Sequence, residues 1–438
     1  MMPSRTQAER ILLWTMPWVA VFTLISGSVF WARRVGWLQP EIYWFAHIRW
    51  LAWFNQQSDS AAASLRVAEF NNSLHALSGA WTLTKWPKQL ILILIAAIVL
   101  SQWRQWRVQR PMSWIGIGLL VLGAGSALGA LWTGRWMALL AGSRSFISWF
   151  VAVFGSTVAT PTVLRAMARV LAALLVVQGV LVAIELQEGV LVYSIHMFDR
   201  DVVRVVGSFN LPLSLGSFAV IAWMAAFCWG ELRASTLTLL GLVLIFVLVP
   251  SGSAVAWVAL LCALAVMALT HMTRPWRIGI LLLALPVMLA IWQLLPTLTG
   301  RHEVHDSLWG RIYPIQQYAE ANLSTRETLF GLGFGEGTNA LGAHQNKSTS
   351  ELGRPMDHAF GDSLPASLFW QVGLTGLILS YAWMGMALHG DARSRPIGVA
   401  IVVSSLAVNV TELFPVNLVL GFWLAHASRV RDHDDATA

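Results

Sequence analysis

The stretch Leu364–Gly385, LPASLFWQVGLTGLILSYAWMG, decides the fold class. It contains no charged side chain and is long enough, as a helix, to cross the hydrocarbon core of a bilayer. Apolar runs of about 20 residues recur along the whole chain. Hydrophobic residues make up 56% of the 438 residues, charged residues make up 12%, and the mean hydropathy is +0.62. We therefore expect an all-α polytopic membrane protein that forms a single integral membrane domain, residues 1–438.

Proline and glycine at the ends of the apolar runs, with polar residues between them, delimit about twelve predicted transmembrane helices. The expected spans are 12–31, 88–102, 113–132, 137–154, 168–186, 211–229, 235–249, 254–270, 278–296, 364–388, 397–410 and 414–427. The first apolar run is too long for the hydrophobic region of a signal peptide, so we expect no cleaved signal.

Arginine residues orient these spans across the membrane. Alternate short loops and the C-terminal tail carry Arg104, Arg107, Arg110, Arg165, Arg169, Arg233, Arg274, Arg277, Arg393, Arg395, Arg429 and Arg431. By the positive-inside rule this side is cytoplasmic, and so are both termini. Three larger polar segments, 32–87, 187–209 and 298–363, then face outward. The last of these separates predicted spans nine and ten.

Composition also excludes some classes of function. The net charge of +7 comes from arginines and lysines that form no continuous patch, which favours contact with anionic lipids over binding of nucleic acid. Cys228 and Cys262 both lie in predicted spans, so we expect no disulfide and no cysteine-based metal site.

The first outer segment contains an aromatic stretch, EIYWFAHIRWLAWFN, at residues 41–55. Its charged residues and its length argue against a span, and aromatic side chains favour the membrane interface. An in-plane helix on the outer leaflet is therefore expected. The alternative is that this stretch holds a lipid-linked substrate.

The second outer segment places two arginines just before a span, in HMFDRDVVRVVGSFN (residues 196–210). Arginine pairs bidentately with phosphate oxygens, so Arg204, with Arg200 and Asn210, is a candidate for contact with a diphosphate. Alternatively, the arginines flank the span or pair with Asp199 and Asp201. That D-x-D pattern also resembles a divalent-metal site, but the arginines already supply counter-charges, and we expect no metal.

The third outer segment carries the most specific pattern. Arg311 ends SLWGR, and Arg326 precedes the glycine-rich GLGFGEG at residues 331–337. Glycines such as Gly333 and Gly335 allow either a sharp turn or the close approach of backbone to a ligand.

A histidine and a carboxylate follow in the same segment, in MDHAFGD (residues 356–362). His358 and Asp362 share one face if the chain there is already helical, so the carboxylate can orient the imidazole. Histidine is well suited to act as a general base near neutral pH. We regard the other histidines of this segment, His302, His305 and His344, as solvated loop residues.

Two further ionisable residues, Arg144 and Glu412, are candidates because charge at membrane depth is costly. Glu412 alternatively sits in a short outer turn. Arg144 either faces an internal cavity or marks a broken helix.

In their order and spacing these motifs resemble those of the O-antigen ligase and O-antigen polymerase superfamily, membrane glycosyltransferases of the GT-C class. The resemblance covers roughly residues 204–376 and rests on four matches: R-x-x-G-S-F-N-x-P at Arg204, S-x-x-x-R at Arg311, G-L-G-F-G, and H-x-x-x-D at His358, which runs into QVGLTG at residues 371–376. The chain departs from the family at SGSAVAW (residues 251–257), where members often carry an arginine, and at Ala359, where many have asparagine.

The resemblance implies a bacterial inner-membrane enzyme whose active site is periplasmic. Its donor would be a glycan on undecaprenyl diphosphate, and its acceptor another lipid-linked repeat unit, lipid A-core or, less often, a protein. Arg204 and Arg311 would hold the diphosphate with help from Arg326, and His358 would deprotonate the acceptor hydroxyl. No cofactor or metal would be needed.

The alternative class is a transporter, either a lipid-linked oligosaccharide flippase or a polysaccharide exporter. Transporters usually show internal repeats and place polar groups near the bilayer midplane. This chain has no evident repeat and concentrates its polar residues in outer loops, and it contains no Walker A pattern.

Overall fold

The computed structural model describes residues 5–34, 78–102, 110–188, 193–197, 200–209, 212–271, 293, 323–338 and 363–437. The helices in these ranges include α1 (Arg5–Arg34), α4 (Ser78–Ser101), α5 (Arg110–Trp132), α6 (Trp136–Phe154), η2 (Gly155–Thr157), α7 (Pro161–Glu188), α8 (Pro212–Trp229), α9 (Ala234–Ser251), α10 (Ala254–His271), α13 (Thr325–Phe330), α15 (Leu364–Gly390), α16 (Arg395–Ser405) and α17 (Val416–Thr437). Seven helices of the described chain are long and apolar enough to cross a membrane, and three shorter apolar helices accompany them. The protein is thus a helical, polytopic membrane protein.

Helices occupy most of the predicted spans, with some different limits. Helix α4 begins at Ser78 rather than at residue 88, and α16 ends at Ser405 rather than at residue 410. The predicted span 278–296 falls outside the described residues apart from Gln293. The described chain therefore contains seven candidate spans, whereas the sequence predicted twelve in the whole chain.

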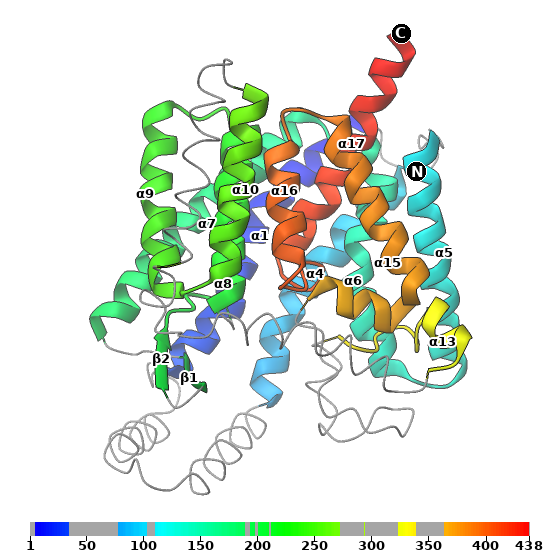
Figure 1. Cartoon of the computed structure of the whole chain (residues 1–438), viewed down its shortest axis with the longest axis horizontal. Coiled ribbons are helices and arrows are strands. Elements are labelled where there is room, and N and C mark those ends of the chain that lie inside the picture. Colours follow the sequence, from blue (N-terminus) through cyan, green and yellow to red (C-terminus); the bar gives the residue numbers. More distant parts are fainter. Residues whose placement is uncertain are drawn as a thin grey trace, which may run out of the picture.

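A short β-hairpin, absent from the sequence-based prediction, lies in the second polar segment. Strand β1 (Tyr193–Met197) pairs antiparallel with β2 (Arg200–Arg204), so that Tyr193 lies opposite Arg204. Figure 1 shows this hairpin and α13 at one end of the helical bundle, with both chain termini at the other end. Parts of the polar segments 187–209 and 298–363 therefore share one end of the molecule.

Large aromatic side chains pack against glycines in the middle of the bundle. The indole rings of Trp149 in α6 and Trp383 in α15 are 5.9 Å apart, and a Cβ at Gly116 of α5 would lie 2.7 Å from Trp383. Gly421 of α17 lies against the backbone carbonyl of Ser148 in α6. Small residues let membrane helices approach closely, so these contacts fix α6 among its neighbours.

The connection between α16 and α17 is buried although it is not helical. Helix α16 has 11 residues and is therefore about 16 Å long, roughly half the thickness of the hydrocarbon core. Residues 407–415, which continue from it, are all buried. Non-helical backbone at membrane depth is tolerated where it is buried in protein or lines a water-filled cavity. We call residues 406–415 the re-entrant segment.

Candidate functional site

The glycine-rich turn, residues 331–338, is packed tightly against the rest of the protein. Gly331, Gly333, Gly335 and Gly337 all have positive φ, which favours glycine. A Cβ at Gly335 would overlap the carbonyl oxygen of Ala138, and one at Gly333 would lie 2.6 Å from the guanidinium of Arg135. The close approach at these two glycines is therefore to the protein's own atoms. A substrate contact by Gly333 or Gly335 stays a prediction.

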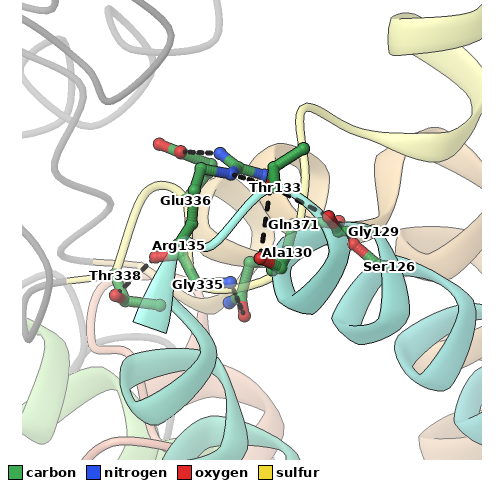
Figure 2. Close-up of polar contacts among 9 residues, drawn as sticks. All are labelled: Ser126, Gly129, Ala130, Thr133, Arg135, Gly335, Glu336, Thr338 and Gln371. Atoms are coloured by element: carbon green, nitrogen blue, oxygen red, sulfur yellow. Dashed lines mark hydrogen bonds and ion pairs between the residues drawn. The ribbon is translucent and has the colours of Figure 1, made fainter. Parts of the chain in front are cut away.

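A buried ion pair holds this turn to the connection between α5 and α6. Nη1 of Arg135 lies 2.6 Å from Oε1 of Glu336, whose side chain is fully buried, while that of Arg135 is 14% exposed. Figure 2 shows the pair together with Thr133, whose hydroxyl accepts a hydrogen bond from Nε of Arg135 at 3.2 Å. The two partners are 201 residues apart, and neither lies in a charge pattern that the sequence would single out.

Figure 2 shows Gln371 beside Gly335 of the same turn. The side chain of Gln371 connects this turn to both α6 and α15. Its Oε1 accepts hydrogen bonds from the backbone N–H of Gly335 at 3.3 Å and from the hydroxyl of Ser145 at 3.2 Å. Its Nε2 donates to Oγ of Ser367 at 2.9 Å, one turn earlier in α15. Gln371 is buried, so each of these bonds is protected from water.

Helix α13 docks where α15 is interrupted. Gly373 has φ 68° and ψ −169°, and a Cβ there would overlap the backbone of Leu329. Ser324 and Glu327 form a capping box at the start of α13, a pattern readable in the sequence as S-x-x-E. Arg326 is exposed on this helix. Its contact with a diphosphate stays a prediction.

The backbone that follows Arg204 is held by two buried side chains of α7. Oε2 of Glu185 accepts hydrogen bonds from the backbone N–H groups of Val206 and Gly207, each at 3.1 Å. Oε1 of Gln178 accepts from the N–H of Ser208, and Nε2 of Gln178 donates to the hydroxyl of Ser208, both at 2.8 Å. The R-x-x-G-S-F motif is thus an ordered turn at the foot of the hairpin, fixed by residues that the sequence did not single out.

Arg144 and Glu412 lie together at depth. Nη2 of Arg144 donates a hydrogen bond to the backbone carbonyl of Glu412 at 2.8 Å. Glu412 belongs to the re-entrant segment and is 8% exposed. Glu412 lies in a turn between two helices, and that turn is buried.

Most of the remaining predicted residues lie outside the described part of the chain. Asp199, Asn210, Arg311, His358 and Asp362 lie outside the described residues, as does the aromatic stretch 41–55. Arg200 and Arg204 are the first and last residues of β2. Among the described residues, no group of three or more histidine, cysteine, aspartate or glutamate side chains is arranged to hold a metal ion.

A separate polar group caps α15 at the opposite end of the bundle. Oδ2 of Asp391 lies 3.4 Å from Nε2 of His426, and its Oδ1 accepts a hydrogen bond from the backbone N–H of Arg393 at 2.9 Å. Burial by itself raises the pKa of Asp391, but the hydrogen bonds from His426, Ser394 and Arg393 outweigh it and lower the pKa to about 2.

The comparisons with known proteins add no assignment to this geometry. No protein-family model matches the chain, and no curated protein matches its sequence significantly.

Proposed function

We propose that this protein is a metal-independent membrane glycosyltransferase of the O-antigen ligase and polymerase type. It would transfer a glycan from undecaprenyl diphosphate to an acceptor hydroxyl at the periplasmic face of a bacterial inner membrane. In this proposal the sequence-based count of about twelve spans places both termini in the cytoplasm. One of these predicted spans, at α16, is too short to cross the membrane by itself and continues into the re-entrant segment. Polymerisation of lipid-linked repeat units is preferred over ligation to lipid A-core.

One observation carries the proposal. Two of the motifs that resemble the family, R-x-x-G-S-F and G-L-G-F-G, are separate in sequence but belong to polar segments at the same end of the bundle (Figure 1). Each is held by buried polar side chains, Glu185 and Gln178 for the first and Glu336 and Gln371 for the second. Buried polar networks are costly unless they are fully satisfied. Such rigid support is what a site needs to place charged side chains around a substrate.

The chemistry of the transfer needs few parts. The leaving group is a diphosphate, a weak base, so positive charge on its oxygens and a base for the acceptor hydroxyl suffice. Arg204 and Arg311 would bind the diphosphate, with Arg326 assisting, because preorganised cations in a poorly hydrated site stabilise developing charge. His358, oriented by Asp362, would take the proton from the acceptor hydroxyl. The reaction is then a single in-line displacement at the anomeric carbon.

The decisive experiment uses the purified protein in liposomes with a lipid-linked glycan donor and no ion gradient. Glycan transfer under these conditions supports the enzyme, whereas movement of the donor across the bilayer without transfer supports a flippase. Arg311→Lys keeps the charge but loses the bidentate fork, so we expect transfer to fall strongly while membrane insertion stays normal. Arg165→Lys, at the opposite end of the bundle, is the matched control. Normal transfer by Arg311→Lys would contradict the assigned role of that arginine.

The product of the reaction is read in cells. A strain lacking the protein that displays a single repeat unit on its lipid A-core indicates a polymerase. A strain that accumulates lipid-linked polymer and lacks long glycan on lipid A-core indicates a ligase.

A further inference from the structure

Arg144 has no part in the chemistry proposed above, yet it lies inside a candidate span. It is about 12 Å along α6 from Trp136, at 1.5 Å per residue. Its side chain is half-buried. An ionisable side chain at this depth generally faces the interior of a bundle or a cavity and marks a functional site.

The guanidinium of Arg144 makes a hydrogen bond within the protein but does not use all of its N–H donors there. It donates one hydrogen bond, from Nη2 to the carbonyl of Glu412 at 2.8 Å, and among the described residues it makes no other. A guanidinium has five N–H donors. The remaining donors of Arg144 are therefore available to a ligand.

A network in the re-entrant segment orients a carboxylate beside this cation. Oε1 of Glu412 accepts a hydrogen bond from Nδ2 of Asn409 at 3.0 Å, and Oδ1 of Asn409 accepts one from the hydroxyl of Thr411 at 2.6 Å. All three side chains are buried. A cation and an oriented carboxylate thus lie together at the same depth.

Unpartnered polar groups lie on the two helices that flank this pair. The side chain of Asn417 in α17 is fully buried, and neither its Oδ1 nor its Nδ2 has a hydrogen-bond partner within the described chain. The buried hydroxyl of Ser148, one turn along α6 from Arg144, likewise has none there. Helices α6 and α17 touch at Ser148, where Gly421 packs against its carbonyl. Buried polar groups are normally paired, so these groups point to a polar ligand or water.

The same turn of α6 also docks the glycine-rich turn. Ser145, next to Arg144, shares Oε1 of Gln371 with the N–H of Gly335. The ring of Phe146 lies 4.9 Å from that of Phe334. Arg144 is therefore adjacent to the proposed site and deeper in the bundle.

The mixture of charges selects the class of ligand. A carboxylate beside the arginine repels phosphate, whereas a sugar hydroxyl accepts from the guanidinium and donates to the carboxylate. We infer that Arg144 and Glu412, supported by Asn409, bind hydroxyl groups of the glycan on the lipid-linked substrate and not its diphosphate. This inference rests on the proposed function.

Equilibrium binding to the full chain in nanodiscs tests it, with intrinsic tryptophan fluorescence as the readout. One probe is the lipid-linked donor extracted from a strain lacking this protein, and the other is synthetic undecaprenyl diphosphate without a glycan. We expect Arg144→Gln to weaken binding of the glycan-bearing probe by about 10- to 100-fold and to leave undecaprenyl diphosphate binding unchanged. Arg165→Gln should leave both unchanged. Thermal unfolding of each variant shows whether it is folded.

Each result has a defined reading. Equal loss for both probes would mean that Arg144 contacts the diphosphate, and unchanged binding would mean that it only joins α6 to the re-entrant segment; either overturns the inference. If Arg144→Gln does not fold, the variant Arg144→Lys replaces it, because a lysine ammonium can still donate a hydrogen bond to the carbonyl of Glu412. Unchanged binding of the glycan-bearing probe by Arg144→Lys would again overturn the inference. A wild-type protein that binds neither probe would refute the proposed function as well.

Discussion

Removing the partner of a buried carboxylate should release the glycine-rich turn. Arg135→Ala leaves the fully buried Glu336 without its cation, and breaking such a pair costs about 3–5 kcal/mol. Because Arg135 is 14% exposed, we expect the lower end of that range, about 3 kcal/mol. Each 1.4 kcal/mol is a factor of ten, so the fraction of molecules with an undocked turn should rise roughly a hundredfold.

The rate of maleimide labelling at a buried position of the turn measures this fraction. Thr338 is fully buried, so Thr338→Cys, in a chain with Cys228→Ala and Cys262→Ala, reacts only when the turn opens. The labelling rate should rise about a hundredfold in Arg135→Ala. In the double variant Arg135→Met with Glu336→Leu the rate should return towards that of the parent, because an apolar pair needs no counter-charge.

The ion pair between Arg165 and Glu231 is a matched control. The side chain of Arg165 is 33% exposed and that of Glu231 is 65% exposed, so the pair should contribute at most about 1 kcal/mol to stability. Arg165→Ala should therefore not change labelling at position 338. If Arg135→Ala also changes the rate by less than about threefold, the buried ion pair does not hold the turn and the reasoning is wrong.

Three further predictions follow from the site and from the opposite end of the bundle. His358→Ala should lower glycan transfer by about 10²–10⁴-fold while donor binding persists, whereas His344→Ala should transfer normally; loss of donor binding in His358→Ala would refute a general base. Arg204→Lys should lower transfer strongly at normal expression, and an active variant would remove this arginine from the diphosphate site. Asp391, whose pKa is lower in the folded than in the unfolded state, should contribute about 2 kcal/mol above about pH 4 and lose it as the pH falls towards 2. Thermal unfolding across this range should show a smaller pH dependence in Asp391→Asn, and an identical dependence would show that the carboxylate does not contribute.

The apolar runs predicted the positions of helices well because burial in lipid requires long uninterrupted apolar segments. The same reasoning placed the end of α16 five residues late. Residues 406–410, LAVNV, are mostly apolar, so the sequence predicted that the span continues through them. It missed the hairpin before the R-x-x-G-S-F motif, because each strand has only five residues and β2, RDVVR, carries three charged side chains.

The support of the candidate site was harder to predict. The glycines of GLGFGEG predicted either a sharp turn or a close approach of the backbone, and their positive φ values confirm the turn. Of the two partners of that turn, Arg135 sits in no motif, and Gln371 opens the QVGLTG stretch without any sign of its contact with the turn. Both are distant from the turn in sequence, so only tertiary packing reveals these contacts. Conversely, the roles of Arg311 and His358 stay predictions, because they come from motifs alone.

The short helix α16 also constrains how the chain enters the membrane. An 11-residue apolar segment is too short for a translocon to insert as an independent span. Its buried face, including Ile397, Ala400 and Ile401, must find protein partners, and α10 and α15 pack beside it. Helix α10 is synthesised more than a hundred residues before α16, so α10 is in the bilayer before its packing partner α16 has been made. Insertion of the last two helices is therefore a late step of biogenesis, and truncation after α15 should leave α10 with an open apolar face inside the membrane.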